Sequence, residues 1–496
     1  MNYKSALLVV TAAVMLSGEP HEIEVPKHPQ AESLIREADQ LPPEFAADII
    51  LLLIEYGFVP DHASRNILLE KAFSLAASAQ EPVALQRAEQ PGPVSNALND
   101  VFKEGLDEVS LESRTIRLFA RSDPARAREL FEHMSLPLGT TFTCTDPLYY
   151  DLSIYYAAML DIANTLPDRQ MLEHFLQHQA SQLRSIAQIA PTVRIVLNLR
   201  QAHSDLNDVL KTVVTQLPNL DHDPRIFSFD AVNVLSAMSD IDALSVIDTD
   251  YVAQQSRKWL LKEMKAGFCT IQGGTVARLD GSQAHLEPLS PVDFFNQRFA
   301  SSANGALIIR STGIENSPTA TTPDSERHSH RYLELENTYE ILATPEAQRS
   351  ATWQSDMNKF VEDVLQWSDG QLSESERARY YVEKSALMRS ILSTQKLQVS
   401  TTHLTQGEWQ SLQRAVPLAD VPARDAVAQA TVNFFDGPTA RLVYNRRRAL
   451  WFAPVRSLLR SFAEPVAVEP LSASPEPVAA SYAALVKLFE ERGTRY

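Results

Sequence analysis

One segment constrains the fold of this chain more than any other, Leu111–Met134 (LESRTIRLFARSDPARARELFEHM). Its first half follows helical spacing and is stopped at Ser122-Asp123-Pro124. Asp123 can accept hydrogen bonds from the free N–H groups of a new helix, and Pro124 suits the first helical position. The apolar residues then recur at i, i+3, i+4 and i+7, on one helix face: Ala127, Leu130, Phe131 and Met134. The segment therefore predicts a helical hairpin.

Related units recur along most of the 496 residues. Glycine, which weakens helix interiors, is scarce: there are 15 glycines, roughly 3% against an average near 7%. The run Ile49–Ile54 is apolar on all sides and should be fully buried. No fixed repeat period emerges. We therefore expect an all-α fold, an irregular α-α superhelix of solenoid-like helical hairpins, with a Gly-rich insertion that is irregular or contains short strands.

Breaks in the helical pattern divide the chain into blocks. The Gly-rich insertion holds six of the 15 glycines, and long stretches of this kind tend to be functional or disordered. The C-terminal block is followed by a stretch whose four prolines suggest an extended linker. The expected organisation is a leader (1–18), an N-terminal helical block (19–135), a middle helical block (146–266), the insertion (267–330), a C-terminal helical block (331–462), the Pro-rich linker (463–481) and a terminal helix (482–496).

The N-terminus has the pattern of an exported protein. Lys4 precedes the apolar run Ala6–Leu16, which is short for a bilayer span and suits a signal-peptide core. Glu19 stands where a lipobox would carry its lipidated cysteine, which argues against lipid anchoring. We expect a periplasmic or extracellular protein; if the leader is an uncleaved helix instead, the protein is cytoplasmic.

Charge and cysteine content give further expectations for the partners of the protein and for the state of its cysteines. The formal net charge of −17 repels phosphate backbones and so disfavours nucleic acid as a partner. The two cysteines, Cys144 and Cys269, either form one bridge or remain two buried thiols, because spacing alone does not decide between these.

Two pairs of side chains have the spacing of metal ligands. His174 and His178 lie at i, i+4, as zinc-binding histidines do, but Phe175 replaces the glutamate of an H-E-x-x-H site. Further ligands would have to come from elsewhere, for example His203, Asp205 or His222. His330 and Glu334 form a second i, i+4 pair beside His328 and Glu336, where the insertion returns to a helix. The alternative for the first pair is two solvent-facing or locally bonded histidines on a polar helix face. For the second pair it is a charged helix start with glutamate near the positive end of the helix. The sequence indicates no particular cofactor, and zinc at one of these pairs is the possibility that it leaves open.

Motifs for nucleophilic or nucleotide chemistry are weak. The sequence has no G-x-S-x-G, no Walker A loop and no G-x-G-x-x-G. Ser393-Thr394-Gln395-Lys396 matches S-x-x-K but has no K-T-G to accompany it. No catalytic residue can be assigned.

The segment 439–462 reverses the charge of the rest of the chain. It has no acidic residue and combines arginines with aromatic residues, among them Arg446, Arg447, Arg448, Trp451 and Arg456. Such a segment can bind an acidic partner or an anionic membrane surface, or dock on the protein's own acidic body. Pro454 is expected to break its helix, which weakens the membrane alternative.

Three stretches together resemble a group of long, exported, helical bacterial proteins of unassigned function: Leu111–Met134, Pro137–Tyr156 and Tyr339–Leu392. The resemblance implies a bacterial origin and an α architecture. It carries no active site, so it transfers no role to any residue.

These observations lead to one principal hypothesis and two alternatives. The principal hypothesis is an exported α-helical scaffold whose partner is another protein. The first alternative is a hydrolase on the same scaffold with its site around 267–330. The second is a peripheral membrane protein that uses the Arg/aromatic segment.

Overall fold

The structure is a computed structural model that describes residues 29–83, 85–87, 101, 103–136, 148–200, 206–269, 275–277, 283–285, 290–299, 308–309, 328–370, 372–400, 424–461 and 465–493. The described part is 78% helical and contains 21 helices, which confirms the predicted all-α fold. Within it, two antiparallel pairs of three-residue strands occur: β1 (Leu85–Arg87) with β2 (Leu148–Tyr150), and β3 (Thr275–Ala277) with β4 (Gln283–His285). No helix among the described residues has the length and apolarity needed to span a bilayer.

The N-terminal block contains the predicted hairpin. Asp123 lies between its two helices, and its side chain accepts a hydrogen bond from the Arg126 N–H at 3.1 Å. The predicted break and cap are therefore confirmed. The described helices of this block are α1 (Pro29–Ala38), α2 (Pro43–Glu55), α3 (His62–Ala76), α5 (Glu108–Ser122) and α6 (Pro124–His133).

The middle block continues as packed helices joined by short connections. Two short 3₁₀ turns, η1 and η2, precede α9 and follow α10. The elements are α7 (Ser153–Thr165), α8 (Arg169–Ser181), η1 (Ile186–Gln188), α9 (Ile189–Arg200), α10 (Asn207–Gln216), η2 (Leu217–Asn219), α11 (Pro224–Ala243) and α12 (Thr249–Ala266). The described part of the insertion contains β3, β4 and one helix, α13 (Pro291–Arg298), so it is not irregular throughout.

The C-terminal block is more helical than the sequence suggested. Its helices are α15 (His330–Leu342), α16 (Pro345–Gln348), α17 (Trp353–Gln366), α18 (Glu374–Ser400), α20 (Arg424–Phe435), α21 (Pro438–Arg446), α22 (Arg448–Ser461), α23 (Pro465–Ser472) and α24 (Pro477–Glu491).

Two predictions for this block are wrong. Pro454 does not break its helix but lies inside α22, and the expected linker 463–481 contains α23 and the first turn of α24. The physical reason is packing: the α23 side chains Val468 and Leu471 are 2% and 1% exposed, so burial outweighs the low helix propensity of proline-rich sequence. Pro465 and Pro477 occupy first helical positions, where proline is tolerated.

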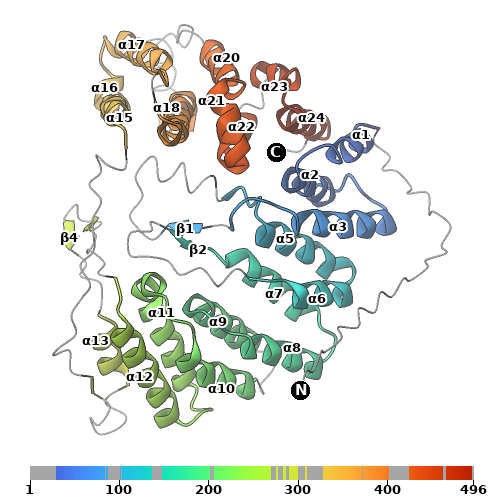
Figure 1. Cartoon of the computed structure of the whole chain (residues 1–496), viewed down its shortest axis with the longest axis vertical. Helices are drawn as coiled ribbons and strands as arrows, with labels where there is room; N and C mark the ends of the chain where they lie inside the picture. The colour runs from blue at the N-terminus through green and yellow to red at the C-terminus, as the bar shows by residue number, and fades with distance from the viewer. Residues whose placement is uncertain are drawn as a thin grey trace, which may run out of the picture.

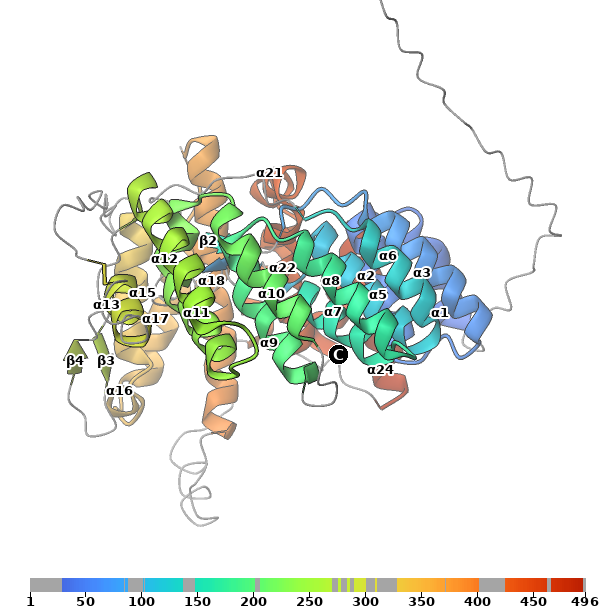
Figure 2. The same cartoon turned by 90° about the horizontal axis from the view of Figure 1, so that it is seen from below.

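The helices follow one another around the molecule, and the last lies against the first (Figure 1). Seen from below, many of them lie side by side (Figure 2). The contact between the two ends includes the Arg492 guanidinium, which donates to the Tyr56 carbonyl at 2.8 Å, and Gln30, which donates to Glu491 at 3.3 Å. The chain thus brings its described ends together.

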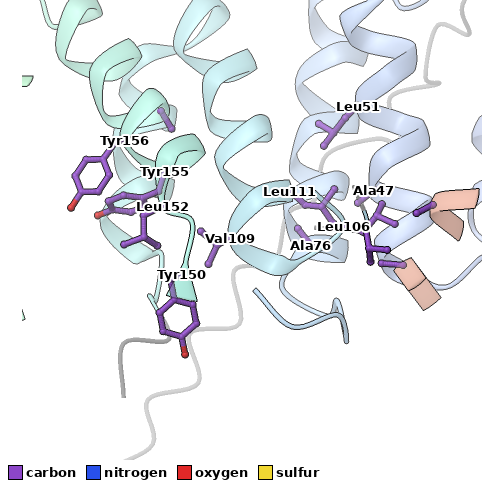
Figure 3. Packing of buried hydrophobic residues seen from close by; sticks show 14 of the residues in the cluster. Ala47, Leu51, Ala76, Leu106, Val109, Leu111, Tyr150, Leu152, Tyr155 and Tyr156 are labelled. Carbon is purple, nitrogen blue, oxygen red and sulfur yellow. The ribbon is translucent and has the colours of Figure 1, made fainter. Parts of the chain in front are cut away.

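Buried apolar side chains form one continuous cluster that extends from Ala31 to Phe489. Every residue of Ile49–Ile54 is at most 5% exposed, which confirms the prediction for this run. Figure 3 shows part of the cluster, where Leu51 of α2, Leu111 of α5 and Tyr155 of α7 belong to the same packed region. The sequence blocks therefore share a core.

Candidate functional site

A pocket of about 450 Å³ lies where α6, α7, α8, η1 and α9 meet. Figure 1 shows α6, α7, α8 and α9 as neighbours in its lower half. Apolar side chains and polar side chains both contribute to its lining: Phe131, Glu132, Met134, Ser135, Leu136, Tyr155, Tyr156, Met159, His178, Gln179, Gln182, Leu183, Arg184, Gln188, Thr192 and Asp221. Its volume is in the usual range for ligand sites. We take this pocket as the candidate functional site.

The floor of the pocket is aromatic and packed into the core. The Phe131 ring stacks on the Tyr155 ring with centroids 4.7 Å apart, and Tyr155 meets Tyr156 edge to face at 5.2 Å. Met159 and Leu183 complete this apolar surface and are 1% and 8% exposed. Figure 3 shows both tyrosines extending from α7. The floor is therefore fixed by the same packing that holds the helices together.

The tyrosine hydroxyls are fixed by hydrogen bonds. The Tyr155 hydroxyl donates to Gln179 Oε1 at 3.2 Å, and the Tyr156 hydroxyl donates to the Gln188 carbonyl at 3.1 Å. Burial raises the pKa of both hydroxyls, so each keeps its proton and remains a donor at physiological pH. These bonds fix the ring positions before any ligand binds.

The turn that carries Arg184 is held from both sides. Gln188 Oε1 accepts hydrogen bonds from the backbone N–H groups of Arg184 at 2.8 Å and of Ser185 at 2.9 Å. The Arg184 carbonyl accepts a bond from the Asp221 N–H at 2.7 Å. The backbones of Arg184 and Asp221 are therefore adjacent at the edge of the pocket, while both side chains are exposed.

The polar rim consists of His178, Gln182, Arg184 and Asp221, all exposed. Among the residues that the structure describes, no hydrogen bond or ion pair engages these four side chains. Arg184 is the only lysine or arginine in the lining. The rim thus presents donors and acceptors that the fold itself does not use.

The first predicted metal pair lies on α8. His174 and His178 are both exposed on α8, and only His178 lines the pocket. His203 and Asp205 lie outside the described residues, and the Nδ1 atom of His222 lies 2.5 Å from Oε2 of buried Glu263. Within the described ranges, no three His, Cys, Asp or Glu side chains are grouped so that they could hold a metal ion. The structure thus gives the zinc hypothesis no support beyond the spacing.

The second pair lies at the start of α15. His330 Nδ1 is 3.4 Å from Glu334 Oε1, and both side chains are more than half exposed, at 87% and 51%. Glu336 accepts a hydrogen bond from the Tyr332 hydroxyl at 2.8 Å. His328 instead lies beside Glu383, a fully buried carboxylate, with Nδ1 and Oε1 3.6 Å apart. Any function for this cluster remains a prediction.

The Arg/aromatic segment packs against the N-terminal helices. Arg448 pairs with Glu44 at 2.8 Å, and Arg447 pairs with Glu81 at 3.5 Å. Trp451 and Phe452 are 2% and 0% exposed, so neither ring is available at the surface. Arg446 is exposed. The binding of an external partner or membrane by this segment remains a prediction, but most of the side chains that suggested it are engaged within the fold.

We call the charged contact between the two ends of the chain the closure; its members are Glu44, Asp48, Glu104, Arg114, Arg448, Arg456 and Tyr482. Asp48 is fully buried at its centre. It accepts hydrogen bonds from Arg114 Nη1 and from the Tyr482 hydroxyl, each at 2.5 Å. Arg456 Nη1 lies 3.7 Å from Asp48 Oδ2 and 2.7 Å from Glu104 Oε2.

The electrostatics of the closure favour its charged form. Burial alone would raise the pKa of Asp48, but the charges of Arg456 and Arg114, together with the hydrogen bonds from Arg114 and Tyr482, outweigh burial and lower that pKa. Asp48 is thus ionised at neutral pH. The closure joins helices from opposite ends of the sequence by buried ion pairs.

Cys269 is disulfide-bonded. Cys144, the other cysteine of the chain, lies outside the described residues, as does the leader 1–18. Cys269 is also 2% exposed, and its N–H donates to the Ser228 hydroxyl at 2.7 Å.

Sequence reasoning missed the pocket. The tyrosines of α7 are visible as a Tyr-rich helix, but helical spacing does not distinguish a pocket floor from ordinary core. The Ser185–Gln188 spacing is a capping-box signal that could have marked the turn carrying Arg184. Nothing in the local sequence places Asp221 beside that turn.

Comparison with known proteins gave no match with a family model, a curated protein or a solved structure. The resemblance to exported helical bacterial proteins therefore remains a prediction.

Proposed function

We propose that this protein is an exported helical scaffold that binds another protein, with the pocket between α6 and α9 as its recognition site. The observation that supports this most strongly is the combination of a fixed aromatic floor with a rim of polar side chains that no described residue engages. A partner side chain would insert onto the floor, and the rim would bind the partner's polar groups. We further propose that the helices form an irregular α-α superhelix, whose extended surface suits such a role.

The pocket has the properties of an anchor site. Phe131, Tyr155 and Tyr156 are held by stacking and by hydrogen bonds to the framework, so a ligand need not order them. Such preorganisation lowers the entropic cost of association. Binding energy in protein interfaces concentrates where a side chain fills a pocket that excludes water. This geometry favours a compact partner segment over a flat surface.

The disulfide at Cys269 supports the export part of the proposal. Disulfides persist in oxidising compartments and are rare in the cytosol of most organisms. The apolar stretch after Lys4 supports the same location. If the protein is exported, alkylation of the unfolded, unreduced protein should leave both cysteines unmodified, whereas prior reduction should expose them.

Site-specific crosslinking in the cell envelope tests the proposed site. A photoreactive residue at position 182, on the rim, should give a discrete adduct with another protein. The same residue at position 341, where the α15 side chain Ile341 is 58% exposed, is the control and should not give that adduct. Ser135→Trp, which adds a large side chain to the pocket lining, should abolish the adduct, and Ser350→Trp on the exposed surface should not. Equal adducts from both positions, or an adduct insensitive to Ser135→Trp, would contradict the proposal.

A further inference from the structure

We propose that the pocket recognises the free C-terminus of the partner chain: Arg184 binds the terminal carboxylate, and the last side chain, an apolar one, lies on the aromatic floor. This inference rests on the proposed function and specifies which part of a partner the site takes. Capture of a chain terminus is a recurring mode of peptide recognition.

Arg184 differs from the other exposed arginines that form no ion pair with a described side chain, such as Arg194, because it lines the pocket. The sequence has 62 acidic and 45 basic side chains, so many carboxylates must lack a cationic partner and an unpaired carboxylate needs no explanation. An arginine at a pocket rim with no ion pair among the described side chains is the less expected case. Its guanidinium presents two parallel N–H donors that match a carboxylate.

The backbone of Arg184 is fixed at the edge of the pocket. Its N–H donates to Gln188 Oε1 at 2.8 Å, and its carbonyl accepts from the Asp221 N–H at 2.7 Å. The main chain is therefore held on both sides and only the side chain is free to adjust. The fold uses the backbone of this residue and leaves its charge for another role.

Two carboxylates in the pocket lining, one on the rim and one outside it, limit the ligand to a single negative charge. Asp221 and Glu132 also line the pocket and are exposed, so a second anionic group would meet like charge. Phosphate-rich ligands are thereby disfavoured. Asp221 is instead suited to accept a backbone N–H of the residues that precede the C-terminus, and Gln182 can both donate to and accept from the same backbone.

The floor determines the last side chain. Phe131, Tyr155, Met159 and Leu183 offer an apolar surface, and the hydroxyls of Tyr155 and Tyr156 already donate to protein acceptors. A charged last side chain would lose its hydration on this surface without gaining a partner. An aromatic or branched aliphatic residue fits the floor.

Peptide arrays test the inference. A library of short peptides with randomised last residues is displayed twice, with a free C-terminal carboxylate and as the C-terminal amide, and is probed with the full-length protein. We expect binding in the free-acid array with apolar last residues, and at least about tenfold weaker binding of the matched amides, as expected for loss of a charge-assisted hydrogen bond. Fluorescence polarisation of the selected peptides gives the ratios.

Matched arginine variants localise the effect. Arg184→Gln should weaken free-acid binding about tenfold and leave amide binding unchanged, so that the preference for the acid disappears. Arg194→Gln, which removes an exposed arginine of α9 outside the pocket lining, should change neither.

The outcomes separate the two proposals. Equal binding of acids and amides that is lost in Ser135→Trp would overturn C-terminus capture and retain the pocket as a protein-binding site. An absence of any peptide that prefers the wild type over Arg184→Gln would also overturn the inference, whatever the crosslinking experiment shows. An absence of both peptide binding and a position-182 adduct would overturn the proposed function as well.

Discussion

Arg456 in the closure and Arg184 at the pocket rim are the same residue type in opposite circumstances. Arg456 is 5% exposed and lies 2.7 Å from Glu104, with Asp48 also within 4 Å. Arg184 is exposed, and no described carboxylate pairs with it. The difference teaches that the fold uses the first charge to hold itself together and does not pair the second with any described carboxylate, which is why we propose a binding role for Arg184.

The two environments predict different losses of folding stability when a charge is disturbed. Taking charges out of water is costly, so a buried charge that loses its partner destabilises a protein far more than an exposed one does. At the centre of the closure, the side chains of Asp48, Glu104 and Arg456 are at most 7% exposed, so these charges are largely removed from water. Damage to the closure should therefore reduce stability, whereas changes at the rim should reduce binding alone.

The largest expected effect is that of Asp48→Asn. It removes the buried negative charge that Arg114, Arg456 and Tyr482 share, and we expect a loss of about 3–5 kcal/mol in the free energy of unfolding. Urea denaturation followed by circular dichroism measures it. Asp161→Asn is the control, because Asp161 pairs with Arg117 at 2.8 Å and its side chain is 34% exposed; this variant should lose less than about 1 kcal/mol. Similar losses in both variants would contradict the structural role of the closure.

A smaller loss is expected for Tyr482→Phe. The Tyr482 hydroxyl donates to the ionised Asp48 at 2.5 Å, and hydrogen bonds to charged groups are worth about 1.5–3 kcal/mol. Tyr339→Phe removes a hydroxyl that donates to the neutral Ser390 carbonyl at 3.2 Å, so its loss should be nearer 1 kcal/mol. If the order of the two losses in urea denaturation is reversed, Asp48 does not carry the charge that we assign to it.

Glu112 is a second buried carboxyl, and its pKa shifts in the direction opposite to that of Asp48. Burial, and secondarily the charge of Glu108, raises the pKa of Glu112 on α5 to about 8. Since an unfolded glutamate titrates near about 4.3, the folded state binds the extra proton between these values, and stability should fall as pH rises through this window. Asp48, whose pKa is lowered, contributes stability above about 3.9 that is lost as pH falls further.

Glu112→Gln tests this assignment. Because residue 112 no longer titrates in this variant, it should be more stable than the wild type by roughly 1–3 kcal/mol above pH 8, and it should lose the decline in stability between about pH 4.3 and 8. Thermal unfolding across that range measures it. An unchanged pH profile in the variant would show that Glu112 is ionised in the folded protein.

The parts of the fold that the sequence predicted depend on local signals. Asp123-Pro124 marks its own helix start, and Ile49–Ile54 signals burial by composition alone. The errors arise where tertiary packing decides: Pro454 lies within α22 because the surrounding residues are buried. The pairing of Arg448 with Glu44 spans 404 residues, and no local pattern could have predicted it.

The candidate site was predictable only in fragments. The spacing of His174 and His178 suggested a metal site on α8. This helix does contribute to the candidate site, because His178 lines the pocket. The contribution of Arg184 depends on a turn fixed by Gln188 and on Asp221, which approaches from a later part of the chain. The side chains that line the pocket come from four α-helices and from residues outside them, so they share no regular spacing in the sequence.

The most direct test of the account compares Arg456→Gln with Arg184→Gln in a single urea denaturation series. The two substitutions are chemically identical, so only the environment differs. We expect Arg456→Gln to lower the free energy of unfolding by about 3–5 kcal/mol and Arg184→Gln to change it by less than about 0.5 kcal/mol. Equal losses in the two variants, or a larger loss for Arg184→Gln, would contradict the division between a charge that stabilises the fold and a charge kept for binding.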